Sequence, residues 1–409
     1  MKLLELIKER NDAITLFEEK ENFIEFIEYN GQTIPRIFDE FWTSKQRQSS
    51  SIHEISYRAC FKPELPRFFI NIFTKKNDVV YDPFSGRGTT VIEAGLLGRR
   101  IISNDVNPLS EILSKPRFFI PDLKEVEKRL NEIPIKKDIE SEIDLSMFYH
   151  PETLKEILSL REYLNKRRDE GKEDKIDLWI RMVATNRLSG HSSGFFSVYT
   201  LPPNQAVSPE RQKKINEKLN QEPQYKNTKE IILKKTRSLL RKITEEQKKN
   251  LYFAGQTGLF LSKDARDTKD IAENSVDLTV TSPPFLDVVQ YHQDNWLRCW
   301  FNGIDSEEIS KKITMAKNIE EWCGIMQEVF FELYRITKKG GYVAFEVGEV
   351  KKGKIALDEY VILLGIKAGF ACEGVLVNLQ RFTKTSKIWG IENNHLGTNT
   401  NRIVVFSKI

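Results

Sequence analysis

The fold is decided by residues 79–90, which read VVYDPFSGRGTT. The apolar residues at the start of this stretch predict a buried strand, its two glycines predict a tight turn, and the VIEAGLLG that follows predicts a helix. A second apolar run, Arg100–Ser103, leads to Asp105 and completes a strand–helix–strand unit. Such units form doubly wound α/β sheets, which bind nucleotide-like cofactors at the carboxyl ends of their strands.

The alternation of strands and helices resumes after a long charged stretch. Residues 121–250 contain long charged segments with helical patterns, and short apolar runs that predict strands return from residue 259 onward. The sequence therefore predicts an α/β, Rossmann-like sheet formed by residues 1–120 and 251–409, with a mainly helical insertion at 121–250. We also expect helix in the first 50 residues, where the apolar positions include Ile24, Phe26 and Ile27.

Composition excludes several classes of protein. The chain has 409 residues, 30% of them charged, with a net charge of +4, and it contains no apolar run of the roughly 18 to 20 residues that cross a bilayer. Its first residues, MKLLELIKERND, lack the continuous apolar core of a secretory signal. Four dispersed cysteines without a CxxC pair, and five histidines without HxxxH spacing, give no metal motif. We expect a cytoplasmic protein that binds no metal and no membrane.

A second motif, TSPPF at residues 281–285, follows the apolar strand VDLTV. Neither proline has an N–H, so the pair ends the strand in a rigid turn whose carbonyls can accept hydrogen bonds. Phe285 adds a flat aromatic face beside these acceptors. The combination suits the exocyclic amino group of a planar base stacked on the ring. The alternative is a turn that only ends a strand.

Together, DPFSGRGTT and TSPPF resemble the motifs of the S-adenosylmethionine-dependent amino-group DNA methyltransferases, and Ser282 resembles their cytosine-N4 branch. FKPELPR at 61–67 and KDAR at 263–266 resemble further cofactor-side segments of that family. The resemblance implies S-adenosyl-L-methionine as cofactor and assigns two groups of residues. Those implied for the cofactor are Lys62, Asp82, Phe84, Ser85, Gly86, Gly88, Thr89, Thr90, Asp105 and Asp264; those implied for catalysis are Ser282, Pro283, Pro284 and Phe285.

The resemblance also implies a mechanism. A flipped cytosine would donate hydrogen bonds from its amino group to the Ser282 side chain and the Pro283 carbonyl, and the methyl group would pass to it directly. Adenine-N6 enzymes of the family usually carry Asp or Asn where Ser282 stands, so adenine N6 is the alternative base. RNA or protein remains an alternative substrate, and a DNA-binding module without catalysis is an alternative of another class.

Double-stranded DNA is the expected partner, and a restriction endonuclease encoded nearby is a further one. Between residues 211 and 249 there are 13 Lys or Arg against 5 Asp or Glu, a local net charge of +8, which suits a surface that faces phosphates. A solvated helix face is the alternative. Other candidate contacts lie near residue 46 and in the polar loop 381–401. The residues expected to contact DNA are Lys45, Arg47, Lys234, Lys235, Arg237 and Lys384.

Overall fold

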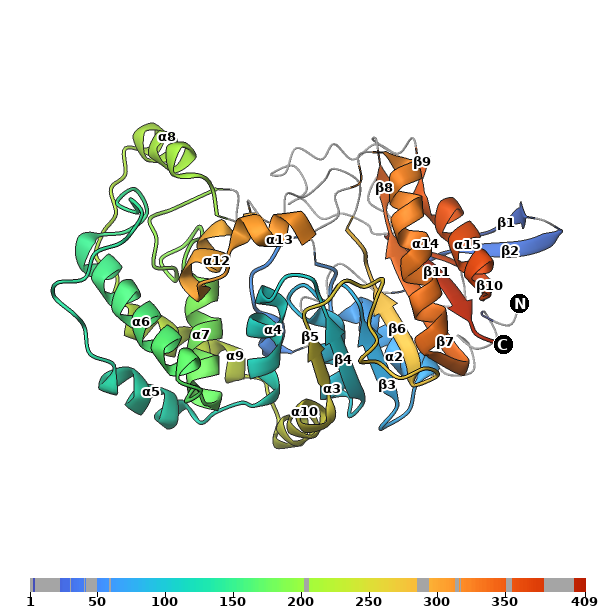
Figure 1. The fold of residues 1–409 in the computed structure, drawn as a ribbon, viewed down its shortest axis with the longest axis horizontal. Helices are drawn as coiled ribbons and strands as arrows, with labels where there is room; N and C mark the ends of the chain where they lie inside the picture. Colours follow the sequence, from blue (N-terminus) through green and yellow to red (C-terminus); the bar gives the residue numbers. More distant parts are fainter. Residues whose placement is uncertain are drawn as a thin grey trace.

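The computed structural model describes residues 3, 23–29, 31–39, 41, 50–58, 60–201, 206–284, 294–312, 316, 318–350, 355–378 and 401–409. A central sheet carries helices on both faces, and a group of helices lies beside the sheet edge that ends in β5 (Figure 1). Within the described part of the chain, none of the helices is long and apolar enough to span a membrane.

In the described part of the chain, the sheet has nine strands in the order β1-β2-β10-β11-β7-β6-β3-β4-β5. Strands β5, β4, β3, β6 and β7 run parallel to one another. Strand β11 is antiparallel to both β7 and β10, and β2 is parallel to β10. The predicted Rossmann-like α/β fold is therefore confirmed. The strands are β1 (Phe23–Tyr29), β2 (Gln32–Asp39), β3 (Val79–Asp82), β4 (Arg100–Asn104), β5 (Leu259–Leu261), β6 (Val276–Thr281), β7 (Thr337–Val347), β10 (Ala371–Asn378) and β11 (Asn401–Ser407), with β8 (Glu349–Val350) and β9 (Ile355–Ala356) in a separate pair.

Helices cover the two faces of the sheet because successive strand residues point to opposite sides. Val80 and Leu278 join the apolar core beneath α2 (Glu64–Phe73), α3 (Thr89–Leu96) and α10 (Glu245–Thr257). Val79 and Val276 join the core on the other face, beneath α14 (Ile319–Ile336) and α15 (Leu357–Ala368). Both faces of the central strands are buried, as in other doubly wound sheets.

Most helices between β4 and β5 form a separate helical group (Figure 1). After α4 (Leu109–Ser114) and the turn η3 (Lys115–Phe118), the chain forms α5 (Leu123–Glu132), α6 (Pro151–Asp169), α7 (Lys175–Arg187), α8 (Pro209–Leu219) and α9 (Thr228–Leu240). It then returns through α10, where Gly255 packs so closely on η3 that an added Cβ would lie 2.7 Å from the Cβ of Phe118. The two ends of the insertion therefore touch.

A later segment also packs on the helical group. The helix α12 (Trp296–Asn302) follows the second motif, yet it contacts α6 and α7, and α13 (Ser306–Lys312) comes directly after it. Asn302 donates a hydrogen bond to Thr185 Oγ1 at 2.9 Å and its carbonyl accepts one from Arg168 at 2.7 Å. The sequence predicted that residues 251–409 all belong to the sheet. It gave no sign that α12 packs on α6 and α7, because these helices are far from α12 in the chain.

The expectation of helix around Ile24 is wrong, because residues 23–29 and 32–39 form the antiparallel pair β1 and β2. Phe26 and Ile27 have helical spacing from Phe23, but the dipeptide Asn30–Gly31 between two apolar runs is a hairpin signal. Gly31 has φ of +77°, a value that favours glycine. Pairing of β2 with β10, far along the chain, then holds the hairpin in the sheet.

Candidate active site

The two motif turns lie side by side at one edge of the sheet. β3 and β6 are parallel neighbours, paired at Tyr81 and Thr279, and the strand order reverses between them. Ligands of doubly wound sheets bind outside the strand ends at such a reversal. Thr281 Oγ1 donates a 2.7 Å hydrogen bond to Asp82 Oδ1, so the turn after β6 is bonded directly to the turn after β3.

The turn after β3 is bonded to the end of β4. The Ser85 N–H donates to the Asn104 carbonyl at 2.9 Å, and the Ser103 hydroxyl donates to Ser85 Oγ at 2.9 Å. The Gly86 N–H then donates to Asp105 Oδ2 at 2.8 Å. These bonds bring the expected cofactor residues of the first motif together with Asp105.

Two positions of this turn, 86 and 88, require glycine. Gly86 and Gly88 have φ of +53° and +79°, values that other residues adopt only with strain. At Gly88 a Cβ would also lie 2.6 Å from the Cβ of Ser114, which precludes a side chain. At Gly88 the close neighbour is therefore the protein itself.

The remaining residues of the first motif continue into α3. Thr89 and Thr90 are buried in its first turn, and Thr90 Oγ1 donates to the Val280 carbonyl at 3.0 Å, which bonds the first motif to β6. Phe84 is half-buried and packs on the core beneath α14. Lys62 is half-buried just before α2, and its carbonyl accepts a bond from the Leu65 N–H at 3.1 Å.

Two carboxyl groups at this edge have neutral partners. Burial raises the pKa of Asp82 to about 7, although Thr281 and the Phe84 N–H donate to it. Burial also raises the pKa of Asp105 to about 6, against the N–H groups of Asn107 and Gly86. Within the described part of the chain, neither carboxylate forms an ion pair with Lys or Arg. A cationic ligand would therefore meet two carboxyl groups with unused capacity for positive charge.

Asp264, the third expected acidic residue, is different. Arg266 donates to both of its carboxylate oxygens, at 2.9 and 2.6 Å, and these hydrogen bonds lower the pKa of Asp264. Asn104 fixes this loop, because its amide donates to the carbonyls of Pro83 and Lys263 and accepts from the Lys263 N–H. Asn104 thus connects the first motif, β4 and the KDAR segment, a role for which the sequence alone carries no signal.

The turn after β6 has one carbonyl already engaged. Pro283 is buried, and the Pro284 carbonyl accepts a 3.0 Å hydrogen bond from the Trp322 indole on α14. Ser282 is half-buried and hydrogen-bonds to the carboxyl group of Glu346 at the end of β7. Phe285 lies outside the described residues. Trp322 and Glu346 were not expected, although a lone acidic residue in the apolar strand YVAFEV is a visible signal.

A nucleoside cofactor with positive charge fits this arrangement. Each Asp105 oxygen accepts one backbone N–H, so each keeps a lone pair for a ribose hydroxyl. Asp82 and Asp105 supply negative potential at the strand ends when they are ionised, and a bound cation favours this ionised form. In the described part of the chain, no cluster of three or more His, Cys, Asp or Glu residues could hold a metal ion.

The family model described as DNA methylase matches residues 7–112 of this chain. This match supports the predicted resemblance to the amino-group DNA methyltransferases. The DNA methylase match contains the whole first motif and Asp105, and it ends before the helical group. The second motif lies beyond it.

Two relatives match this chain over 296 and 108 residues. The Type II methyltransferase M.BsoBI of Geobacillus stearothermophilus is 24% identical over 296 residues, which cover 64% of this chain and 55% of the relative. The tRNA (guanine(10)-N2)-dimethyltransferase of Methanocaldococcus jannaschii is 31% identical over 108 residues, covering 22% of this chain and 30% of that protein. The chain thus spans about half the length of the first relative, and less of the second.

Solved structures give only distant similarity. The rRNA methyltransferase aviRa of Streptomyces viridochromogenes has a TM-score of 0.35 and 10% identity, covering 88% of this chain and 90% of that chain. A TehB-like SAM-dependent methyltransferase of Corynebacterium glutamicum has a TM-score of 0.32 and 7% identity, covering 84% and 87% of the two chains.

The expected DNA contacts divide into three groups. Lys234 and Arg237 are exposed on α9. Lys235, between them, has only 11% of its side chain exposed and pairs with Glu54 at 3.7 Å. Lys45, Arg47 and Lys384 lie outside the described residues.

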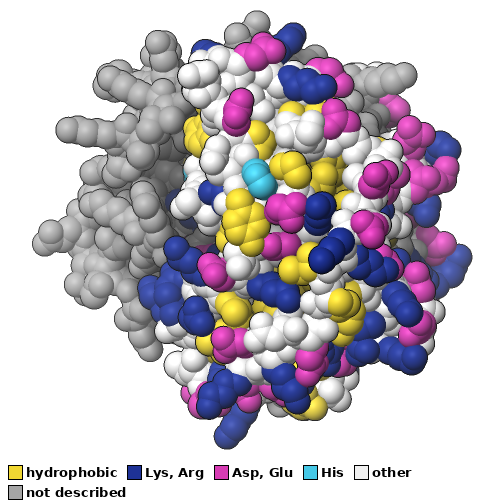
Figure 2. Space-filling model, turned by 90° about the vertical axis from the view of Figure 1, so that its left-hand side faces the viewer, with side chains coloured by type: hydrophobic (Ala, Val, Ile, Leu, Met, Phe, Trp, Pro, Cys, Tyr) yellow, Lys and Arg dark blue, Asp and Glu magenta, His cyan; other side chains and the backbone are white. Residues whose placement is uncertain are grey.

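Acidic residues from other parts of the chain offset the basic segment. Glu54 also pairs with Arg241, and Asp144 lies 3.6 Å from Lys213. Figure 2 accordingly shows lysines and arginines interspersed with acidic side chains on the face of the helical group. The local charge of +8 in the sequence therefore overstates the positive potential of this surface.

Proposed function

We propose that this chain is a DNA methyltransferase that transfers a methyl group from S-adenosyl-L-methionine to the exocyclic N4 amino group of cytosine. The hydrogen bond from Thr281 to Asp82 carries the proposal, because it joins the turn suited to a nucleoside cofactor to the turn suited to an amino group. The DNA methylase match and the similarity to a Type II methyltransferase support the same activity.

The residues of the first motif would bind and orient the cofactor, which supplies a methyl group on a sulfonium. Asp105 would accept the two ribose hydroxyls, and Asp264 the adenine amino group after partial release of Arg266. Asp82 would attract the cofactor's ammonium group. Phe84 and the backbone at Gly86 would lie along its methionine portion.

The second motif would position the base. Ser282 Oγ and the Pro283 carbonyl would accept the two amino protons of cytosine, which directs the nitrogen lone pair toward the methyl group. The amino nitrogen would form a bond to the methyl group that the cofactor supplies, with the electrons of the broken S–C bond left on sulfur, and would release one proton to water. Methyl transfer from a positively charged sulfonium to an amino group is faster in a site that excludes water.

Double-stranded DNA is the proposed substrate, contacted by Lys234 and Arg237 of the helical group. The chain would serve as the modification enzyme of a restriction–modification system. Its gene, expressed in a host, would then protect DNA from a nuclease encoded nearby. Cleavage of host DNA to the same extent with and without the gene would contradict this role.

Choice of base is tested by methylation of mixed-sequence DNA followed by nucleoside analysis. We expect N4-methylcytosine, since Ser282 stands where adenine enzymes of the family usually carry Asp or Asn. N6-methyladenine alone would overturn the choice of base and leave DNA methylation standing.

RNA is the second candidate substrate, favoured by the local similarity to a tRNA dimethyltransferase. The matched measurement uses the same enzyme preparation with tRNA in place of DNA. Methyl transfer to tRNA with none to duplex DNA would select this candidate.

A further inference from the structure

Glu346 is a buried acidic residue beside the proposed base-binding turn. Thr281 on β6 pairs with Phe345 on β7, so the next residues, Ser282 and Glu346, are level with each other at the sheet edge. Glu346 is only 8% exposed, and its carboxyl group hydrogen-bonds to the Ser282 side chain. On its other side, Asn401 Nδ2 at the start of β11 donates to Glu346 Oε1 at 2.8 Å.

The chemistry of these groups fixes the direction of the hydrogen bond. A hydroxyl has one proton and two lone pairs, whereas an ionised carboxylate only accepts. While Glu346 is charged, Ser282 must donate its proton to it, and the lone pairs of Ser282 Oγ are left for another donor. An amino group is such a donor.

We infer that Glu346 is a positioning residue that holds the Ser282 hydroxyl as a hydrogen-bond acceptor for the amino group of the target base. This inference rests on the proposed function. If Glu346 were neutral, its own proton could be donated to Ser282 Oγ. The Ser282 proton would then point toward the amino hydrogens of the base and repel them.

The surroundings of Glu346 put this arrangement under the control of pH. Burial raises the pKa of Glu346 to about 7, and the hydrogen bonds from Ser282 and Asn401 oppose the rise. Both of these groups, from the β6 turn and from β11, are neutral. The nearest charge on β11, Arg402, pairs with Asp358 at 3.3 Å. The acceptor state of Ser282 is therefore present above a pH of about 7 and is lost below it.

The main test is a double-mutant cycle between Glu346→Gln and Ser282→Ala in the full chain, with radiolabelled S-adenosylmethionine and DNA. In the wild-type background we expect E346Q to reduce kcat at pH 8 by about 10- to 100-fold, with unchanged affinity for the methyl donor. In the S282A background E346Q should have little further effect. Equal losses in both backgrounds, or no loss in the wild type, would overturn the inference.

The chain offers a matched control on the same sheet. Glu373 on β10 accepts a 2.5 Å hydrogen bond from the Ser407 hydroxyl on β11, at the end of that strand away from Asn401. Glu373→Gln changes the same kind of pair far from the motif turns. It should leave kcat within about twofold of wild type, since it touches neither motif.

The pH profile of the wild-type enzyme is a second test that needs no change at Glu346. Its kcat should fall as pH is lowered from 8 to 6, and this slope should be absent in the residual activity of S282A. Retention of the same slope in S282A would contradict the inference even if E346Q failed to fold. Wild-type enzyme that bound S-adenosylmethionine but methylated neither DNA nor tRNA would instead contradict the proposed function.

Discussion

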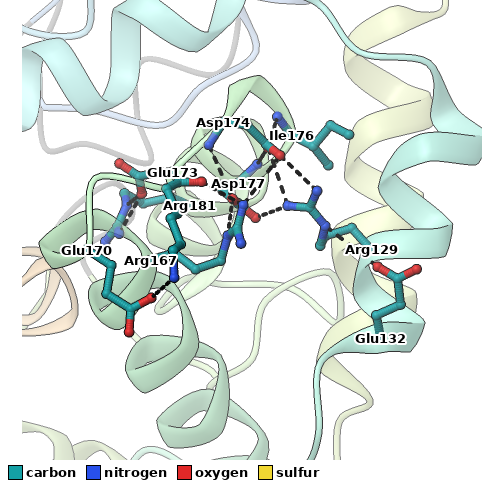
Figure 3. Close-up of polar contacts among 10 residues, drawn as sticks. Arg129, Glu132, Arg167, Glu170, Glu173, Asp174, Ile176, Asp177 and Arg181 are labelled. Carbon is teal, nitrogen blue, oxygen red and sulfur yellow. Dashed lines mark hydrogen bonds and ion pairs between the residues drawn. The ribbon is translucent and has the colours of Figure 1, made fainter.

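Asp177 in the helical group and Asp82 at the sheet edge are both fully buried, yet their partners differ. Asp177 lies between two arginines: Arg167 donates to it at 2.5 Å, and Arg129 bonds to both Asp177 and Asp174 (Figure 3). Asp82 has only neutral donors, chiefly Thr281. The paired carboxylates stabilise the helix packing, whereas those at the sheet edge keep their capacity for positive charge for a ligand.

The largest loss of stability is expected at Asp177, whose carboxylate is paired with two arginines. Asp177→Ala would remove the buried carboxylate that Arg129 and Arg167 share and leave them with the more exposed Asp174 and Glu132. Removal of one partner from a buried pair costs about 3 kcal/mol in free energy of unfolding. Chemical denaturation measures it. Asp169→Ala is the matched control, because Asp169 pairs with Arg168 on the surface and has 68% of its side chain exposed. Equal losses in the two variants would contradict the structural role of Asp177.

The opposite behaviour is expected for Asp105. Asp105→Asn should weaken binding of S-adenosylmethionine by about 10- to 100-fold, or about 1.4 to 2.7 kcal/mol, since one acceptor oxygen is lost. Asp264→Asn should weaken it by only about threefold, because Arg266 already occupies that carboxylate. Isothermal calorimetry distinguishes them, with the exposed Asp267→Asn as control. A larger loss for Asp264 would reverse the ranking.

The two kinds of carboxylate should also differ in pH dependence. The pKa of Asp82 is raised to about 7 in the folded protein, so the folded state holds a proton there that the unfolded state loses near pH 4. Its contribution to stability therefore falls as pH rises from about 4 to 7. The pKa of Asp174 is lowered, chiefly by Arg129 against its burial, so its contribution is lost only as pH falls below about 4.

The variant Asp82→Asn should accordingly lose less stability than wild type between pH 5 and pH 7.5. Asp174→Asn should follow the wild-type change in this range. Unfolding by urea at the two pH values measures the difference. Parallel curves for Asp82→Asn and wild type would show that Asp82 does not retain its proton on folding.

The smallest effect is expected on the salt dependence of DNA binding. Lys234→Glu with Arg237→Glu should lower the slope of log affinity against log salt by about two, because each phosphate contact contributes about 0.9 to it. The exposed Lys269→Glu, on the sheet side of the molecule, should leave the slope unchanged. An unchanged slope in the double variant would indicate that α9 is a solvated helix face that does not contact DNA phosphates.

Local patterns were sufficient to predict most of the sheet. The strands β3 and β6 and the YVAFEV part of β7 are mainly apolar runs, and the two motifs end β3 and β6 as expected. Strand β7 itself begins earlier, at Thr337, and includes Lys338–Gly341. The N-terminal hairpin was missed because helical spacing was given more weight than Asn30–Gly31.

Other parts of the site depend on distant residues. Burial of Lys235 follows from Glu54, and the surroundings of Glu346 follow from Ser282 and Asn401. Such contacts join elements that the sequence separates by more than fifty residues. Spacing and composition alone therefore carry no information about them.

Contact between the two ends of the insertion, at Gly255 and Phe118, has an evolutionary consequence. A segment that leaves and re-enters a sheet at one point can be lengthened, shortened or exchanged while the strands keep their register. The constraint on such exchange is α12, whose Asn302 bonds to α7 and must find an equivalent partner. Recombination between related genes could thus renew the helical group while β3 and β6 keep the same chemistry.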